Sequence, residues 1–382
     1  TTTASPTTEL AVPATTMPQS EADLGPSRLI AAPVIGQVSG WPAFDLHLQT
    51  IVDAGSPAVS ATVLRDGEVV HEVALGVRTP DGDPVQIGDR FRVASISKVI
   101  TAITVLRLVQ SGQLEMDEAV GARLAARVGA APSAGVDSIT VRHLLTHRSG
   151  IAQYENLMFA RQVESCGQAA ATGLSRALER VPGTTLRYSN LNFCLLGLLI
   201  EDVTGRPYAD VVRAELLEPL QLDGMRLAGT FDVRDGEVDH RSDAGRNYME
   251  VLGASGSWLA SPTEVATIID SLDLTTAGWK PLSAELVAEM MAITVDPPPA
   301  DPAATTTVVT APPTRGYGMG LMIFSPESFG HTGTLESTHA MTARGEGGYT
   351  WAITVSGDHP SSSRDLAGII AEGFRYAGVF AG

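Results

Sequence analysis

Residues 91–98 read Phe-Arg-Val-Ala-Ser-Ile-Ser-Lys and lead directly into an apolar helical pattern. Apolar residues recur at spacings of three and four as far as Leu106, and Ser-Gly at 111–112 ends the run, so this stretch predicts a helix. Lys98 and Lys280 are the only lysines in the chain. A desolvated lysine can lose its proton and act as a base, whereas arginine stays charged. Residues 91–98 are therefore a candidate catalytic site.

Ser95 and Lys98 stand three residues apart, which makes them neighbours on a helix, with Cβ atoms about 5–6 Å apart. In the first helical turn, unpaired backbone N–H groups and the helix dipole favour negative charge developing on Ser95. The spacing S-x-x-K also arises by chance, and Ser97 could be only a polar residue at a helix start. Further motif residues elsewhere in the chain are needed to distinguish a catalytic pair from a chance spacing.

Two such partners follow in a fixed order. Arg187-Tyr188-Ser189-Asn190 precedes a second apolar helical run, 191–203, that ends at Gly205. Gly330-His331-Thr332-Gly333-Thr334 follows the strand-like residues 319–324. A serine with S-x-x-K, then Y-x-N, then K/H-T-G, resembles the signature of the penicillin-recognising serine hydrolases. The sequence is similar to the class C branch, which includes class C β-lactamases, DD-carboxypeptidases and related esterases.

The resemblance covers residues 58 to 374, about the whole chain outside its N-terminal part. It includes four weaker stretches that occur in the family's order: 141–150, 188–205, 254–261 and 317–320. It implies an α+β fold of the β-lactamase/transpeptidase type, with an antiparallel sheet built from both termini, flanked by helices, and an inserted mainly helical lobe. We therefore expect a flexible Thr/Pro-rich tail at 1–27, an α/β lobe from 28–98 with 313–382, and a mainly helical lobe at 99–312.

Local patterns supply elements for this fold. A hairpin is predicted from 58–64 and 69–77 around Asp66-Gly67, and a second from 339–344 and 349–356. A last helix carries Leu366 and Phe374 on one face. Residues 261–264, Ser-Pro-Thr-Glu, predict a capping box, and 296–314 predict an irregular loop rich in Pro, Ala and Thr.

The resemblance assigns roles in acyl transfer through a serine ester. Ser95 attacks a carbonyl, and the base is Lys98 or Tyr188, acting as a coupled pair whose proton position stays open. Our hypothesis is that burial beside a partly positive helix end lowers the pKa of Lys98. Asn190 is expected to hold Lys98 and to donate a hydrogen bond to the substrate's acyl side chain. A buried structural tyrosine and a helix N-cap are the alternatives for Tyr188 and Asn190.

The second half of the expected site is 331–334. By match to the family, the backbone N–H groups of Ser95 and Thr334 form the oxyanion hole, and His331, Thr332, Gly333 and Thr334 bind substrate. His331 stands where β-lactamases usually have lysine, which favours a DD-carboxypeptidase or esterase over a potent β-lactamase. Arg315 is a candidate for binding a terminal carboxylate, with a surface arginine as the alternative.

One residue after His331-Thr332-Gly333 also departs from the family. Ser337 stands where glycine is common, and with Glu336 it could narrow the pocket or repel a carboxylate.

His143 and His147 have the spacing of zinc ligands on a helix, but no third ligand suggests itself, so we interpret both as structural. No metal and no cofactor are expected. A G-x-S-x-G elbow, a phosphate loop and a dinucleotide fingerprint are absent from the sequence.

Composition restricts the partners. The 382 residues are 44% hydrophobic and 18% charged, as in a well-cored globular protein, and the net charge is −17. Such an acidic chain disfavours nucleic acid and anionic membranes. The longest apolar run, 193–200, is shorter than the roughly twenty residues that a transmembrane helix needs. The expected partner is a small-molecule or peptide substrate: a peptidoglycan stem peptide, a β-lactam or an ester. The oligomeric state stays open.

The Thr/Pro-rich start favours an exported protein, extracellular or associated with the cell envelope, whose signal segment is absent from this chain. A cytoplasmic enzyme with an irregular N-terminus is the alternative. Cys166 and Cys194 could form a disulfide in an exported protein. The position of Cys194 within an apolar helix favours two buried thiols instead.

The function expected from the resemblance is a serine hydrolase, foremost a D-alanyl-D-alanine carboxypeptidase or a hydrolase of similar D-amino-acid peptides. A β-lactamase or carboxylesterase on the same scaffold is the first alternative. A non-catalytic binding module that retains the fold is the second, and the survival of every motif residue argues against it.

Overall fold

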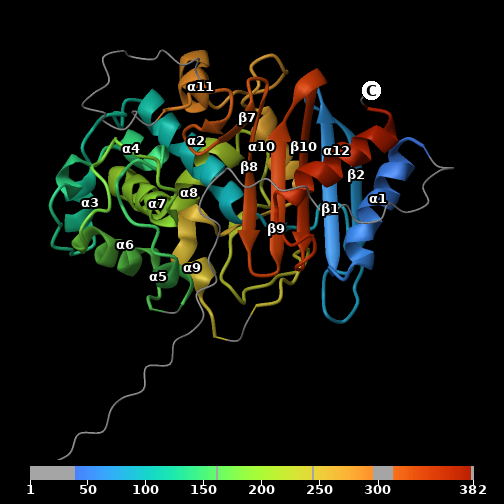
Figure 1. Ribbon diagram of the computed structural model, residues 1–382, viewed down its shortest axis with the longest axis horizontal. Coiled ribbons are helices and arrows are strands. Elements are labelled where there is room, and N and C mark those ends of the chain that lie inside the picture. The colour runs from blue at the N-terminus through green and yellow to red at the C-terminus, as the bar shows by residue number, and fades with distance from the viewer. Residues whose placement is uncertain (1–38, 161, 243–244, 296–312, 380–382) are drawn as a thin grey trace, which may run out of the picture. The chain divides into compact units, whose positions relative to one another are not determined.

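A seven-stranded antiparallel sheet dominates the computed structural model, which describes residues 39–160, 162–242, 245–295 and 313–379 (Figure 1). Its strand order is β2-β1-β10-β9-β8-β7-β6. The strands are β1 (Ala58–Arg65), β2 (Glu68–Gly76), β6 (Gly316–Tyr317), β7 (Met322–Ser325), β8 (Ser328–Leu335), β9 (Thr338–Arg344) and β10 (Tyr349–Ser356). A small second sheet of order β3-β5-β4 contains β3 (Phe91–Arg92), β4 (Arg226–Leu227) and β5 (Trp258–Ala260).

The large sheet joins the two ends of the described chain. β1 pairs with β10 along its whole length, from Ala58 opposite Ser356 to Arg65 opposite Tyr349. A two-residue turn connects β1 to β2, and its residues Asp66 and Gly67 have φ of 52° and 87°. Positive φ at both positions suits the twist of a tight hairpin, which explains why Asp-Gly stands there. The predicted fold class is confirmed.

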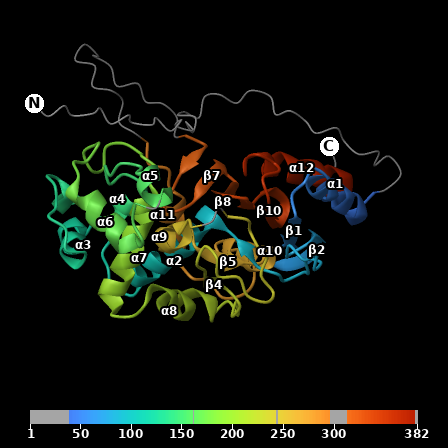
Figure 2. The ribbon, with the colours of Figure 1, turned by 90° about the horizontal axis from the view of Figure 1, so that it is seen from below.

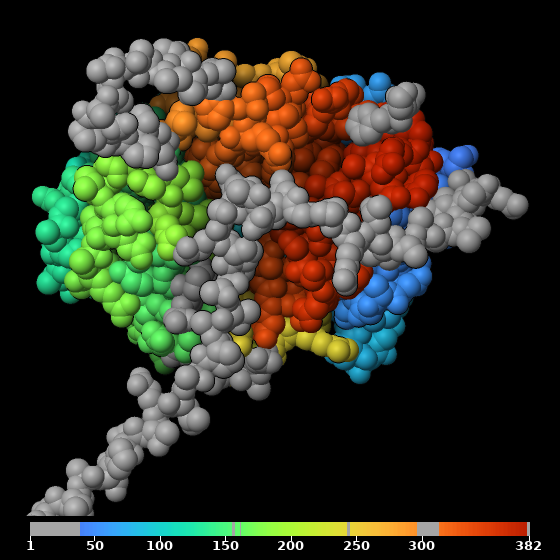
Figure 3. Space-filling view, viewed as in Figure 1, coloured from blue at the N-terminus to red at the C-terminus, as the bar shows by residue number. Residues whose placement is uncertain are grey.

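Two terminal helices cover one face of this sheet. α1 (Trp41–Asp53) lies beside α12 (Asp365–Ala377), and Figures 1 and 2 show both on the same side of β1 and β10. The rings of Phe44 and Phe374 stack at 5.8 Å between their centroids, within a core that also contains Leu48 and Ile370. In the space-filling view the blue surface of the N-terminal segments adjoins the red surface of the C-terminal ones (Figure 3).

Helices also cover the opposite face. α10 (Pro262–Asp270) packs against β1, β9 and β10, and Ser261 and Glu264 form the predicted capping box at its start. The remaining helices are α2 (Ser97–Gln110), α3 (Gly121–Arg127), α4 (Val141–Leu145), α5 (Glu155–Phe159), α6 (Cys166–Ser175), α7 (Asn190–Thr204), α8 (Tyr208–Val212), α9 (Tyr248–Leu252) and α11 (Ala284–Met291). Short helical turns are η1 (Ala94–Ile96), η2 (Val136–Ser138), η3 (Arg213–Leu217), η4 (Gly253–Ser255) and η5 (Glu346–Gly348).

α2 and α7 are the two central helices of this region. Both are apolar on nearly every side and bury most of their residues in the larger core. A helix that is hydrophobic all round has to be buried, so the sequence places these two inside and leaves the shorter helices to surround them. The starts of α2 and α7 carry the two motifs that contain Ser95 and Tyr188.

The prediction of two buried thiols was wrong. Cys166 and Cys194 form a disulfide, with Cα atoms 5.7 Å apart, that ties the first turn of α6 to α7. Burial of Cys194 inside α7 gave no information about which element packs against it, and the packing of α6 on α7 decides the matter.

Two other expectations fall partly outside the described residues. The tail at 1–27 lies outside them entirely, and most of the predicted loop at 296–314 does too. The division into a tail and two lobes stays a prediction. Within the described ranges, no helix combines the length and apolar character needed to cross a bilayer.

Candidate active site

A short turn presents Ser95 at the junction of the two sheets and α2. β3 ends at Arg92, Ala94 has a φ of 49°, and Ser95 lies in η1 directly before α2. A left-handed conformation at a residue with a Cβ costs about 1–2 kcal/mol, so the surrounding contacts must impose it. β5 supplies two: Val93 N donates to Trp258 O at 3.2 Å, and Trp258 N donates to Ser97 Oγ at 3.2 Å. The Ser97 side chain thus holds the turn in place.

Lys98 is fully buried directly below this turn. Its Nζ lies 3.0 Å from Ser95 Oγ, 2.8 Å from Asn190 Oδ1 and 2.8 Å from the Ser255 carbonyl oxygen. The amide and carbonyl oxygens can only accept, so each takes one N–H of the amine. A neutral amine then directs its lone pair at Ser95 Oγ, whereas an ammonium directs a third N–H there. In its neutral form Lys98 is therefore placed to receive the proton of Ser95.

Tyr188 lies against the same amine. It is half-buried, and its ring centroid is 5.0 Å from Lys98 Nζ. The following Ser189 is the N-cap residue of α7 without a side-chain capping bond, and Asn190 is the first helical residue. The alternative of Asn190 as an N-cap is therefore wrong. Its side chain instead contacts Lys98, and the Ser95 hydroxyl, the Lys98 amine and the Tyr188 ring lie close together.

β8 forms the wall opposite the Ser95 turn. A Cβ on Gly333 would stand 2.4 Å from the Val93 carbonyl oxygen and 3.0 Å from Ala94 Cβ, so only glycine allows the strand to approach this closely. Thr332 is half-buried and Thr334 is exposed, with Thr334 Oγ1 donating to Ser363 Oγ at 2.8 Å. The oxyanion hole from the backbone of Ser95 and Thr334 stays a prediction.

The remaining predicted site residues occupy different surroundings. His331 is fully buried, with Nε2 3.2 Å from Tyr317 Oη and Nδ1 2.6 Å from the Thr332 carbonyl oxygen. Arg315 is exposed in the segment before β6 and makes no ion pair with any residue in the described part of the chain. Their assignment to substrate binding stays a prediction. Ser337 has a φ of 47°, the region that favours glycine, which accounts for the glycine common there in the family.

Three groups at the site were not predicted: the His147 and Tyr317 side chains and the Ser255 carbonyl. Each belongs to one of the weaker family-like stretches, 141–150, 317–320 or 254–261. Those matches were the available signal, but they did not indicate which residue of each stretch points to Lys98 or Tyr188.

His143 and His147, which have the spacing of zinc ligands, lie in different surroundings in the structure. His143 completes a capping box with Thr140 at the start of α4, which confirms its structural role. α4 ends at Leu145, and His147 beyond it has a φ of 56° and is fully buried against Tyr188. In the part of the chain that the structure describes, His, Cys, Asp and Glu side chains do not gather in the threes that a metal site needs.

Burial sets the protonation of the groups around Tyr188. Loss of solvent, and then the nearby Lys98 amine, lower the pKa of His331 to about 3. The same causes, in the same order, hold the pKa of His147 well below its usual range. Burial raises the pKa of the Tyr317 phenol well above its usual value. All three groups are therefore neutral at neutral pH, and His331 supplies no cation there.

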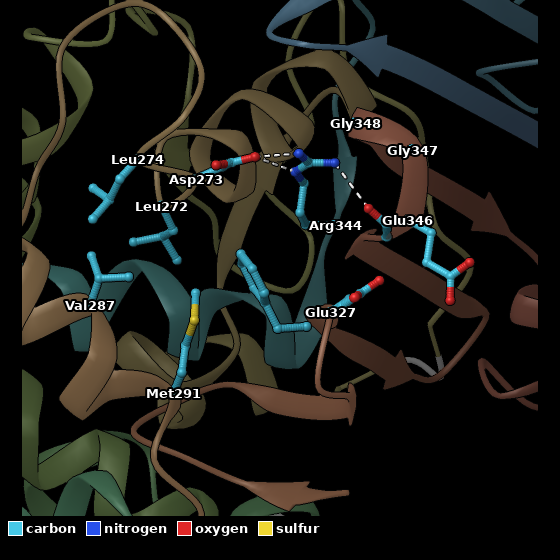
Figure 4. Close-up of a pocket in the computed structure, with 12 residues that line it drawn as sticks. Leu272, Asp273, Leu274, Val287, Met291, Glu327, Arg344, Glu346, Gly347 and Gly348 are labelled. Atoms are coloured by element: carbon cyan, nitrogen blue, oxygen red, sulfur yellow. Dashed lines mark hydrogen bonds and ion pairs between the residues drawn. The ribbon is translucent and has the colours of Figure 1, made fainter. Parts of the chain in front are cut away.

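A hollow of about 430 Å³ lies elsewhere, between α11 and the far ends of β8 and β9 (Figure 4). Figure 4 shows its apolar side, with Leu272, Val287 and Met291, facing the ion pair of Asp273 and Arg344. Its lining includes none of the predicted site residues. This hollow is therefore separate from the candidate site around Ser95.

A profile of the beta-lactamase family matches residues 44–373 of the sequence, which is most of the chain. The chain belongs to the beta-lactamase family. The predicted resemblance is confirmed, and the hydroxyl–amine–phenol arrangement around Ser95 lies within the matched region.

An esterase and a penicillin-binding protein are similar to this chain in sequence. Esterase EstB of Burkholderia gladioli is 33% identical over 187 residues, which cover 44% of this chain and 46% of that protein. Penicillin-binding protein 4 of Amycolatopsis lactamdurans is 30% identical over 174 residues, 44% of this chain and 43% of that one. The matched region spans less than half of the length of each of these relatives.

The fold extends to solved structures. A D-stereospecific amidohydrolase from Streptomyces sp. superposes with a TM-score of 0.66 at 25% identity, covering 87% of this chain and 98% of that one. The beta-lactamase family fold thus accounts for nearly all of the described chain.

Proposed function

We propose that this beta-lactamase family member is a serine hydrolase that forms an acyl-enzyme at Ser95. The contact of 3.0 Å between Lys98 Nζ and Ser95 Oγ carries the proposal. A serine hydroxyl is a weak nucleophile until an adjacent base takes its proton. Lys98 is that neighbour, and it donates one N–H to each of two acceptor oxygens, Asn190 Oδ1 and the Ser255 carbonyl.

The proposed reaction has two halves. Ser95 Oγ bonds to the substrate carbonyl carbon while its proton passes to the Lys98–Tyr188 pair, and the carbonyl oxygen becomes an oxyanion facing the backbone N–H groups of Ser95 and Thr334. The bond to the leaving group then breaks, and Tyr188 donates a proton to the departing amine or alkoxide. Water attacks the ester in the second half, which returns the proton and frees Ser95.

The proposed substrates are peptides of D-amino acids, foremost those ending in D-alanyl-D-alanine. The names of the Amycolatopsis penicillin-binding protein and the D-stereospecific Streptomyces amidohydrolase support this choice. Asn190, Thr332 and Thr334 are the proposed hydrogen-bonding groups for the peptide. Because His331 is neutral and buried, we assign the terminal carboxylate to Arg315.

A carboxylesterase is the second candidate, and one observation favours it. His331 offers no charge to a substrate carboxylate, and an ester substrate needs none. The similarity to EstB agrees with this option. A β-lactamase, whose substrates carry a carboxylate, is less well served by the same neutral side chain.

Rates on three substrates test the proposal: a D-Ala-D-Ala peptide with a free carboxylate, a chromogenic cephalosporin and a nitrophenyl ester. We expect the peptide to have the highest kcat/KM, its C-terminal amide to react more slowly, and Ser95→Ala to abolish every rate. Turnover of the ester alone would establish the carboxylesterase. No turnover, with Ser95 unmodified by an activated phosphonate, would refute the hydrolase altogether.

We also propose that the protein works outside the cytoplasm. The disulfide between Cys166 and Cys194 supports this, because disulfides persist in oxidising compartments. Protein released from its own cells into an alkylating buffer should contain no reactive thiol. Two alkylated cysteines per chain would contradict the proposal.

A further inference from the structure

A continuous series of hydrogen bonds from His147 through Tyr317 to His331 lies against Tyr188. His147 Nε2 is 3.2 Å from Tyr317 Oη, and Tyr317 Oη is 3.2 Å from His331 Nε2. The three residues come from the loop after α4, from β6 and from β8, which are separate segments of the sequence. His147 and His331 are completely buried and Tyr317 is 7% exposed.

The contacts of His147 fix the direction of proton donation along this series of hydrogen bonds. Its Nδ1 is 3.3 Å from the backbone N of Ser189 and 3.0 Å from Asn192 Nδ2. The orientation of the Asn192 amide is set by its Oδ1, which accepts from Ser149 Oγ at 2.6 Å. Both neighbours of Nδ1 are donors, so Nδ1 has to accept and cannot carry a proton. The proton of this ring therefore sits on Nε2 and is donated to Tyr317 Oη.

The His331 end agrees with that direction. Its Nδ1 lies 2.6 Å from the carbonyl oxygen of Thr332, which only accepts, so Nδ1 carries the proton. Nε2 is then an acceptor, and Tyr317 donates its hydroxyl proton to it. One arrangement of protons satisfies every polar atom of the chain, from His147 through Tyr317 to His331 and the backbone of β8.

This chain is in ring contact with Tyr188. The ring centroids of His147, Tyr317 and His331 lie 4.3, 6.0 and 6.5 Å from that of Tyr188. The bond from Ser189 N to His147 Nδ1 also anchors the residue next to Tyr188. A buried, neutral set of rings therefore borders the Tyr188 ring.

We propose that Tyr317, joined to His147 and His331, is a positioning residue that fixes the Tyr188 phenol relative to Ser95. The inference rests on the proposed function for its kinetic consequence. Tyr317 acts through Tyr188 and does not touch substrate. Its hydroxyl accepts from His147 and donates to His331, so removing that hydroxyl breaks both bonds at once.

The Tyr317→Phe variant breaks the chain without removing a ring. It leaves His147 Nε2 and His331 Nε2 buried without their partner, so the rings are expected to shift until each finds another. A displacement of the phenol by an ångström is enough to slow the chemical step roughly ten- to hundredfold. We expect kcat for the nitrophenyl ester to fall by that factor, with KM changed less than threefold.

A double-mutant cycle with Tyr188→Phe separates positioning from general destabilisation. If Tyr317 acts through Tyr188, adding Tyr317→Phe to Tyr188→Phe lowers kcat by less than twofold. Tyr208→Phe is the matched control, because it also deletes a buried hydroxyl, one that contacts Thr101 and Trp258. Its effect should be the same in both backgrounds. An equal loss from Tyr317→Phe in both backgrounds, or no loss in either, would overturn the inference.

A second measurement does not depend on turnover. In protein labelled with ¹³C in its tyrosine rings, the Tyr188 signal, assigned by its disappearance in Tyr188→Phe, should shift or broaden in Tyr317→Phe and not in Tyr208→Phe. An unchanged Tyr188 signal would overturn the inference. If Tyr317→Phe does not fold, His147→Leu breaks the bond between His147 and Tyr317, and the same two outcomes apply. Absence of turnover in the wild type, with the shift present, would count against the proposed function alone.

Discussion

Gly333 shows how one absent side chain sets the width of the site. Its missing Cβ leaves room for the Val93 carbonyl, which a Cβ would approach to 2.4 Å. A Cβ there would also approach Ala94 Cβ to 3.0 Å. Because these two contacts are to a backbone atom and a Cβ atom, neither β8 nor the Ser95 turn can relieve them by moving a flexible side chain. The position of Thr334 relative to Ser95 therefore depends on this glycine.

Gly333→Ala is expected to lower kcat/KM by roughly a hundredfold, because β8 has to move away from the Ser95 turn. Gly368→Ala is the control: it lies in α12, its Cβ would meet nothing within 4 Å, and alanine there should leave activity unchanged and raise stability by about 0.5–1 kcal/mol. Kinetics of both variants on the nitrophenyl ester check the expectation. Equal activities would show that the approach of β8 is irrelevant to catalysis.

At the scale of single residues, the sequence predicted the catalytic candidates better than the groups that hold them in place. Ser95, Lys98, Tyr188 and Asn190 stand in motifs whose spacing is local, and the structure brings them together. The Ser255 carbonyl has no side-chain signature at all. Contacts of this kind depend on tertiary packing, which spacing within a motif does not report.

Among the elements, the link between α6 and α7 is the one that the sequence left open. α7 begins with Asn190, which holds Lys98, and Cys194 lies one turn further on. The disulfide to Cys166 closes a loop with a sequence separation of 28 residues. It therefore restrains the unfolded chain and fixes α6 against the helix that supports the site.

Replacing both cysteines by alanine is expected to lower the free energy of unfolding by roughly 3.5 kcal/mol, the amount expected from closing a loop of this length. Activity at 25 °C should change little, because neither sulfur contacts Ser95, Lys98 or Tyr188. Urea denaturation of the oxidised protein and the double variant gives the difference. A loss below 1 kcal/mol would show that α6 is held by packing alone.

Element prediction succeeded where the period was clear and failed where it was masked. α2, α7 and the strands β1, β9 and β10 lie within one or two residues of the predicted runs. α1 was missed, although Pro42 stands at its start and its buried residues recur with helical spacing. It follows a segment without pattern and lacks a side-chain cap, so its beginning carries no polar signal.

At the scale of the whole molecule, assembly of the sheet could not be derived from patterns. β1 pairs with β10 across nearly the entire sequence, and only the family resemblance predicted that partner. The same assembly buries histidines between elements. Desolvation lowers the pKa of His240 and of His331 from 6.5 to about 3 in the folded protein.

These buried histidines make stability depend on pH. Between pH 6.5 and 3 the unfolded chain binds a proton at each site that the folded protein does not, so the free energy of unfolding falls as the pH falls. Each site contributes a slope of about 1.4 kcal/mol per pH unit in that window and none above it. Acidification from pH 7 to 5 should therefore cost roughly 2 kcal/mol per histidine.

His240→Gln provides the matched comparison. His240 lies outside the proposed catalytic groups, and its Nε2 accepts from the Arg92 backbone N at 3.2 Å, as a glutamine oxygen can. Urea denaturation at pH 7 and 5 should show a smaller loss in the variant than in the wild type, by roughly 2 kcal/mol. Identical losses would mean that His240 is not buried in its neutral form.

The central claim is that the Lys98 amine activates Ser95 for acylation. Mass spectrometry of the protein quenched in acid within seconds of mixing with a nitrophenyl ester or penicillin tests it directly. The account predicts an acyl adduct on the peptide that contains Ser95, lost in Lys98→Arg and retained in Lys280→Arg, the matching change at the other lysine. An adduct that forms at the wild-type rate in Lys98→Arg, or on a different residue, would contradict it.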